Sequence, residues 1–93
     1  MTNAERKIFL AAINKYGALA QITMVFEEMA ELQDVLCKHL RGRDVNPRHI
    51  AEEIADVGIM LDQMAILFGI EGAVAEQRAF KVGQLQERME SNG

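Results

Sequence analysis

The sequence predicts an all-α protein, an antiparallel helical bundle of about four helices. Apolar residues recur at steps of three and four along most of the chain, which is the period of an amphipathic helix. No stretch alternates between apolar and polar residues as a half-buried strand would, and there is no internal repeat or low-complexity tract. A length of 93 residues allows one modest core, so we expect a single domain spanning 1–93.

The first two helices can be placed from their start and stop signals. Thr2 or Asn3 can cap a first helix over residues 4–15, and a Tyr-Gly pair then breaks or bends the chain. A long second helix over 18–40 follows and ends where Gly42 can take the left-handed conformation of a C′ residue. The two helices together make up the first half of the chain.

The third and fourth helices are equally well marked. Asn46 is a suitable cap and Pro47 suits the first helical position, so a third helix is predicted over 47–68. Two glycines then bracket a short turn before a fourth helix over 73–89. The fourth helix is expected to turn these apolar residues inward: Val74, Val82, Leu85 and Met89.

Both central helices carry a regular apolar stripe that we expect to form the core. In the second helix the stripe consists of Ile22, Val25, Met29, Leu32, Leu36 and Leu40. In the third helix it consists of Ile50, Ile54, Val57, Leu61, Met64 and Phe68. In each helix the row beside the stripe carries an acidic pair, which therefore borders the core; in the second helix the rest of that row is apolar, and in the third it also contains His49 and Gln63.

These acidic residues form two pairs, Glu28 with Glu31 and Glu53 with Asp56. Residues three apart lie on one helix face, with Cβ atoms roughly 5–6 Å apart, which suits two ligands of one hard cation. A short connection makes the two helices antiparallel, so the pairs lie level within about 4.5 Å along the axis. Two unit charges 4 Å apart repel by roughly 4 kcal/mol at an effective dielectric near 20, so the cluster needs a cation or protons. The alternative is a solvated acidic row, which is common on helices.

Composition narrows the possible partners and location. The net charge of −4 gives no general attraction for nucleic acid, so a polyanionic ligand would need a metal bridge. The single Cys37 excludes an internal disulfide and is typical of a reducing cytoplasm. The amino end does not resemble a signal peptide, and no apolar stretch reaches the length of a membrane span. We therefore expect a cytoplasmic protein with neither membrane nor nucleic-acid partners.

The hydrophobic content predicts self-association. Apolar residues make up 49% of a chain that can build only a small core. Several wide apolar helix faces are then left to be shared with other copies. We expect a homodimer or a homotetramer.

The acidic motifs also resemble a known family. Gln21, then Glu27-Glu28-x-x-Glu31-Leu32, then Glu52-Glu53-x-Ala55-Asp56 is similar to the MazG-like nucleoside triphosphate pyrophosphohydrolases, which are all-α. The resemblance implies Mg²⁺-dependent hydrolysis of an NTP or dNTP to the monophosphate and pyrophosphate. It also implies that the metal ligands are Glu28, Glu31, Glu53 and Asp56.

Further residues are candidates for catalysis and substrate binding. Glu27 or Glu31 can accept a proton from the attacking water, and Gln21 can hydrogen-bond a base or ribose. Lys81 and Arg88 lie two turns apart on the fourth helix and can grip phosphates, and the resemblance favours Lys81. A solvated helix face explains these two basic residues equally well.

Two other classes of function remain open. The first is a non-catalytic helical interaction protein that keeps the bundle and binds a basic partner through its acids. The second is a di-metal oxidase, which is disfavoured because His39 and His49 lack the Glu-x-x-His spacing of di-iron bundles. Neither histidine is expected to take part in chemistry.

Overall fold

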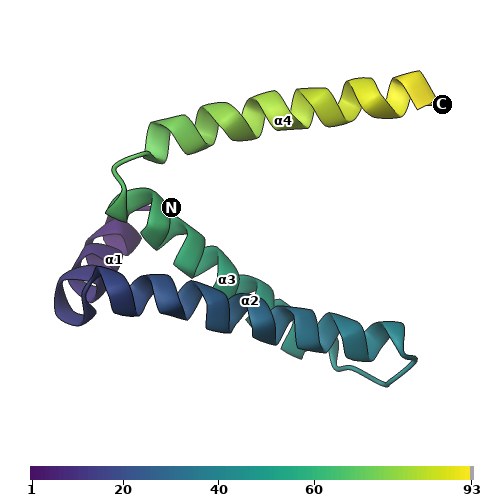
Figure 1. The fold of residues 1–93 in the computed structure, drawn as a ribbon, viewed down its shortest axis with the longest axis horizontal. Helices are drawn as coiled ribbons and strands as arrows, with labels where there is room; N and C mark the ends of the chain where they lie inside the picture. The colour runs from purple at the N-terminus through teal and green to yellow at the C-terminus, as the bar shows by residue number, and fades with distance from the viewer. Residues whose placement is uncertain (93) are drawn as a thin grey trace.

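The computed structural model describes residues 1–92, which form four α-helices (Figure 1). The helices are α1 (Asn3–Tyr16), α2 (Ala18–Leu40), α3 (Pro47–Leu67) and α4 (Glu71–Asn92). No strand occurs among these described residues. The all-α prediction is confirmed, and only α4 extends clearly beyond its predicted bounds.

α2 and α3 form an antiparallel hairpin whose two ends are set by local signals. Gly42 has a φ of 77°, and its N–H donates to the carbonyl of His39 at 3.0 Å, which closes the last turn of α2. The side chain of Asn46 accepts a hydrogen bond from the N–H of Arg48 at 2.9 Å at the start of α3. The hairpin is the largest helix contact in the described chain.

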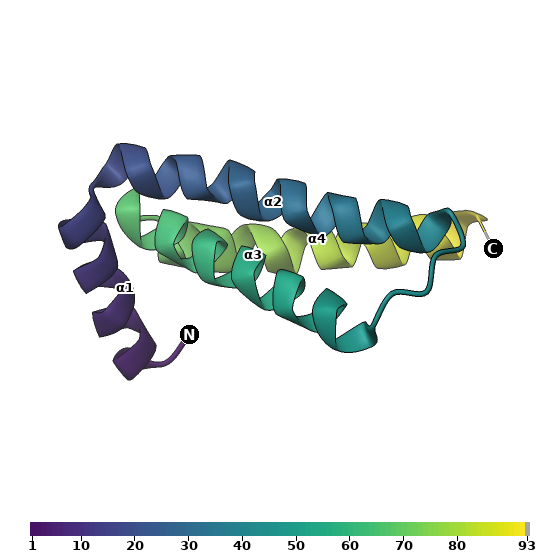
Figure 2. The same cartoon turned by 90° about the horizontal axis from the view of Figure 1, so that it is seen from below.

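α1 packs across the open end of this hairpin and touches both of its helices (Figure 2). Thr2 and Glu5 form a reciprocal capping box at its start, and Phe9 is its buried residue. The chain bends by 112° between α1 and α2, at Gly17, whose φ is 88°. Within residues 1–92 no single helix is long and apolar enough to cross a membrane. Only α1 and α2 taken together, across this bend, have the length and the apolar composition of a membrane span.

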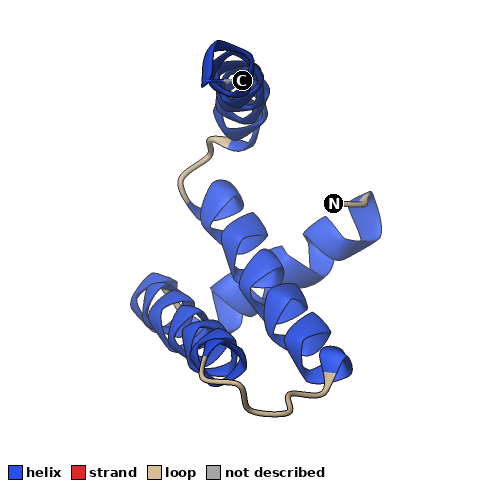
Figure 3. Ribbon diagram, turned by 90° about the vertical axis from the view of Figure 1, so that its right-hand side faces the viewer, coloured by secondary structure: helices blue, strands red, loops and turns tan. Residues whose placement is uncertain are grey.

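α4 stands clear of the hairpin. Its backbone lies close to α3 alone, and its first residue, Glu71, also forms an ion pair with Arg6 of α1. Figures 1 and 3 show the helix leaving the top of α3 and standing apart from α2. The prediction that the fourth helix turns its apolar residues inward is wrong for the single chain, because these residues are exposed: Val74, Val82, Leu85 and Met89. The reason is geometric, since the turn after α3 directs α4 away from the core that those residues were expected to join.

Half of the predicted core stripe of the third helix also faces outward, whereas Ile50, Val57 and Met64 are half-buried. Ile54, Leu61 and Phe68 are 57%, 48% and 61% exposed, and the end of the second helix's stripe, at Leu36 and Leu40, is exposed as well. α2 and α3 meet through Val25 of the predicted α2 stripe and, for the rest, along the neighbouring rows, whose buried members are Gln21, Val35, Glu53, Met60 and Gln63. Helical period identifies the apolar rows, but it does not say which of two adjacent rows contacts the neighbouring helix.

Candidate metal centre

Four carboxylates from the two hairpin helices meet at one point. Glu28 and Glu31 lie on α2, Glu53 and Asp56 lie on α3, and one oxygen from each lies within 4.8 Å of the others. The three-residue spacing puts each pair on one helix face, and the antiparallel hairpin brings the two pairs level. The prediction that the acidic pairs converge is confirmed, and the cluster is suited to holding a metal ion.

Two of these side chains each have one buried oxygen without a hydrogen-bond partner. Glu53 is only 8% exposed, and Glu28 is half-buried, whereas Glu31 is exposed. The Oε2 atoms of Glu28 and Glu53 are both buried and have no hydrogen-bond partner. A buried acceptor without a donor costs free energy, and a charged one costs more. A bound cation would satisfy both oxygens at once.

The electrostatics of the cluster point the same way. The pKa of Glu28 is raised first by burial and then by the negative charges of Glu31, Asp56 and Glu53. The pKa of Glu53 is also raised by burial and by Glu31 and Asp56, and a hydrogen bond from His49 partly offsets this. Without a cation the cluster therefore tends to hold protons, as expected for carboxylates forced together in a partly dry site.

His49, which was not expected to take part in chemistry, is a neighbour of the carboxylate cluster. Its Nε2 lies 3.3 Å from Oε1 of Glu53, one helical turn away. His49, Glu31 and Glu53 line a shallow hollow of about 540 Å³ that opens the acids to solvent. The signal in the sequence was the four-residue spacing from His49 to Glu53, which places both on one face of the third helix.

Gln21 is not a surface residue. It is buried, and its Nε2 donates to Oε1 of Gln63 at 2.6 Å across the α2–α3 contact. Gln21 also lines a second hollow, of about 500 Å³, together with Glu27 and Met60. The structure thus brings Gln21 and Glu27 to one cavity. Gln63 was missed because a lone glutamine in an apolar row shows its partner only when the helices are packed.

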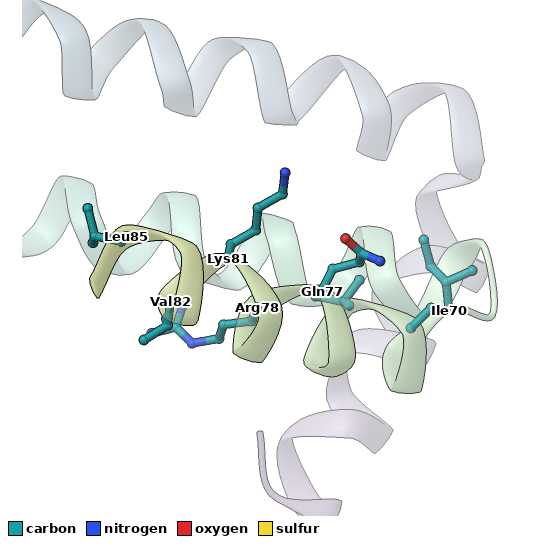
Figure 4. A pocket seen from close by; sticks show the side chains of 8 residues that line it. Ile70, Gln77, Arg78, Lys81, Val82 and Leu85 are labelled. Atoms are coloured by element: carbon teal, nitrogen blue, oxygen red, sulfur yellow. The ribbon is translucent and has the colours of Figure 1, made fainter. Parts of the chain in front are cut away.

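The basic candidates are not brought to the acids within one chain. Lys81 and Arg88 are exposed on α4, which stands away from α2. Lys81 and Arg78 line a hollow of about 580 Å³ along α4, and their side chains leave the helix in different directions (Figure 4). Any contact of these cations with a ligand of the carboxylate cluster requires another copy of the chain or a movement of α4.

Comparison of the chain with protein-family models, with curated proteins and with solved structures finds no match. The family resemblance therefore rests on the acidic motifs of the sequence. The structure adds a chemical observation that is independent of it: four carboxylates converge at a seam, and two of them, Glu28 and Glu53, each have a buried oxygen without a hydrogen-bond donor.

Proposed function

We propose that this protein is a Mg²⁺-dependent nucleoside triphosphate pyrophosphohydrolase of the MazG-like type. The observation that carries the proposal is the cluster of Glu28, Glu31, Glu53 and Asp56 with its two orphaned buried oxygens. All four ligands offer carboxylate oxygen, which suits a hard cation such as Mg²⁺, and none offers thiolate or imidazole. Carboxylate oxygens are the ligands that a hard divalent cation prefers, and such a cation would supply the partner that the two buried oxygens lack, which supports a resident divalent cation.

The reaction we propose is attack of water on the α-phosphorus of the triphosphate. The water oxygen bonds to phosphorus, the bond to the α–β bridging oxygen breaks, pyrophosphate leaves, and a carboxylate takes the proton from water. Bound Mg²⁺ would neutralise charge on the phosphate oxygens and make the attacking water more acidic. Glu31 is the favoured proton acceptor because it is exposed at the hollow beside the cluster, whereas Glu27 lines the other hollow.

The substrate itself would lie across both hollows. Its phosphates belong beside the carboxylate cluster, and its nucleoside fits the cavity that Gln21 and Glu27 share. One N–H of the Gln21 amide donates to Gln63, so its carbonyl oxygen and its second N–H are the groups left to bond a base or ribose. Lys81 and Arg88 are the cations we assign to the phosphate charge that Mg²⁺ leaves unneutralised.

One observation favours the alternative of a non-catalytic interaction protein. In the single chain no cation of α4 reaches the acidic seam, so the cluster alone could serve a basic partner. The two functions differ in what they release. A binding protein would bind its partner at the seam and leave every triphosphate intact.

The test is to incubate the protein with each common NTP and dNTP in Mg²⁺ and to measure pyrophosphate. We expect release with at least one nucleotide, loss of release in excess chelator, and loss in Glu53→Gln. Glu52→Gln is the matched control, because Glu52 is the exposed neighbour with the same charge. Full activity in chelator or in Glu53→Gln would refute the metal assignment, and intact nucleotides throughout would favour the binding protein.

A further inference from the structure

The described chain exposes more surface than a folded chain of its mass should. Its accessible surface is 7141 Å² at 10.4 kDa. A compact monomer of this mass exposes roughly 5,400 Å², so the excess is about 1,700 Å². A standard protein interface buries about 800 Å² on each partner. The excess is therefore large enough for a stable contact with a second copy.

Much of this surface belongs to α4. None of its residues 71–91 is buried in the single chain, yet the helix carries an exposed apolar stripe made of Val74, Val82, Leu85 and Met89. A solitary helix is marginal in water, because its stability in proteins comes mainly from packing an apolar face. α4 therefore needs a surface to pack against.

Two contacts hold α4 away from its own hairpin. Gly69, at a φ of 65°, donates its N–H to the carbonyl of Ile66 at 3.1 Å, and Ile70 donates to Ala65 at 2.9 Å, which together make a Schellman motif. This motif sets the direction in which the chain leaves α3. α4 is thus presented outward rather than left on a free linker.

An ion pair supports the same orientation from the other side of the turn. The guanidinium of Arg6, on α1, donates to both carboxylate oxygens of Glu71 at 2.9–3.2 Å. The two-pronged geometry fixes direction better than a single hydrogen bond does. It ties the first residue of α4 to α1, and so keeps the helix from swinging back over α3.

The outer face of α3 offers a surface of matching shape. Ile54, Leu61 and Phe68 recur every seven residues and are exposed, forming an apolar row about 21 Å long at 1.5 Å per residue. The stripe of α4, from Val74 to Met89, is about 22 Å long by the same measure. On α2 the exposed large apolar residues are Leu19, Phe26, Leu36 and Leu40, and the polar Gln33 interrupts their seven-residue series between Phe26 and Leu40.

We propose that α4 is an exchanged arm, and that α4 of each copy packs along the Ile54–Leu61–Phe68 row of a second copy. Because each copy both gives an arm and receives one, the contact is made twice and closes as a two-fold dimer. The occupant is a second copy because this chain carries both the uncovered stripe and the uncovered row, and the surface excess matches a dimer contact.

The test is association measured by sedimentation velocity with two single substitutions in the full chain. Leu85→Lys alters the arm and Leu61→Glu alters the row, and each alone should turn the dimer into monomer. Ala79→Lys and Ala55→Glu are matched controls at exposed positions outside the stripe and the row, and both should remain dimeric. Circular dichroism checks that each variant keeps its helices, and Leu85→Gln and Leu61→Gln replace any variant that does not.

Mixing the two monomeric variants gives the decisive result. A mixed pair contains one contact in which both sides are altered and one in which the arm and the row are both unaltered, so the mixture should recover dimer that neither variant forms alone. A monomeric wild type would overturn the proposal. So would association that survives Leu61→Glu but is lost in Phe26→Glu, which would place the contact on α2, or a mixture that stays monomeric.

Discussion

Replacing Glu53 by glutamine tests the carboxylate cluster without depending on any enzymatic assay. Glutamine has nearly the same shape, but it carries no charge and makes a poor ligand for Mg²⁺. Glu53 is the most buried of the four carboxylates, and its Oε2 has no hydrogen-bond partner. The substitution should therefore affect the apo protein and the Mg²⁺ complex in opposite directions.

In the apo protein the effect follows from the raised pKa of Glu53. The folded protein holds this proton to higher pH than the unfolded chain does. The stability linked to it is fully present below the unfolded pKa of about 4.3 and is lost as pH rises through the folded pKa. Glutamine mimics the protonated side chain. Without metal, Glu53→Gln should melt at or above the temperature of the wild type at pH 7.5, and the difference should shrink as the pH falls toward 4.

With Mg²⁺ the order reverses. A ligand at ten times its Kd stabilises the folded state by about 1.4 kcal/mol, which raises the Tm of a domain of this size by about 6–11 °C. Loss of even an outer partner of a metal weakens affinity by roughly 10–100-fold, and loss of a direct ligand should do no less. At a tenfold weaker affinity the same Mg²⁺ stabilises Glu53→Gln by only about 0.4 kcal/mol, or roughly 2–3 °C.

The assay is thermal unfolding at pH 7.5 with MgCl₂, compared with NaCl of matched ionic strength. Glu52→Gln makes the same charge change at the exposed neighbour and should keep the full Mg²⁺ shift. Equal shifts in MgCl₂ and NaCl, or the same Mg²⁺ shift in Glu53→Gln as in the wild type, would show that the four carboxylates are merely solvated.

Three further predictions concern the scaffold, and each is checked by denaturant unfolding against the wild type. Gln21→Ala leaves the buried amide of Gln63 without its partner and should lower the free energy of unfolding by about 1–3 kcal/mol. Changing both residues to leucine should restore most of this loss, and no recovery in the double variant would refute the pairing. Thr2→Ala removes the cap of α1 and should cost about 1 kcal/mol, and an unchanged midpoint would contradict the capping box. Gly69→Ala forces a Cβ into the left-handed region and should cost about 1–2 kcal/mol; a stabilised variant would mean that the turn after α3 is not left-handed.

The sequence by itself determined the helices and the meeting of the acids, because both depend on local rules. Asn46 and Gly42 mark helix ends through hydrogen bonds with residues only a few positions away, so the α2–α3 connection could be placed from the local sequence alone. Once the two helices are known to be antiparallel, three-residue spacing is enough to bring Glu31 and Asp56 together.

Tertiary structure decided which face each helix buries and where α4 goes. The outward turn of Ile54 and Leu61 depends on the packing of α2 against α3, and a periodic pattern with two adjacent apolar rows is compatible with either choice. The direction of α4 depends partly on the contact of Arg6 with Glu71, which joins residues 65 positions apart. No local signal announces such a pair, because its partners become neighbours only after the chain has folded.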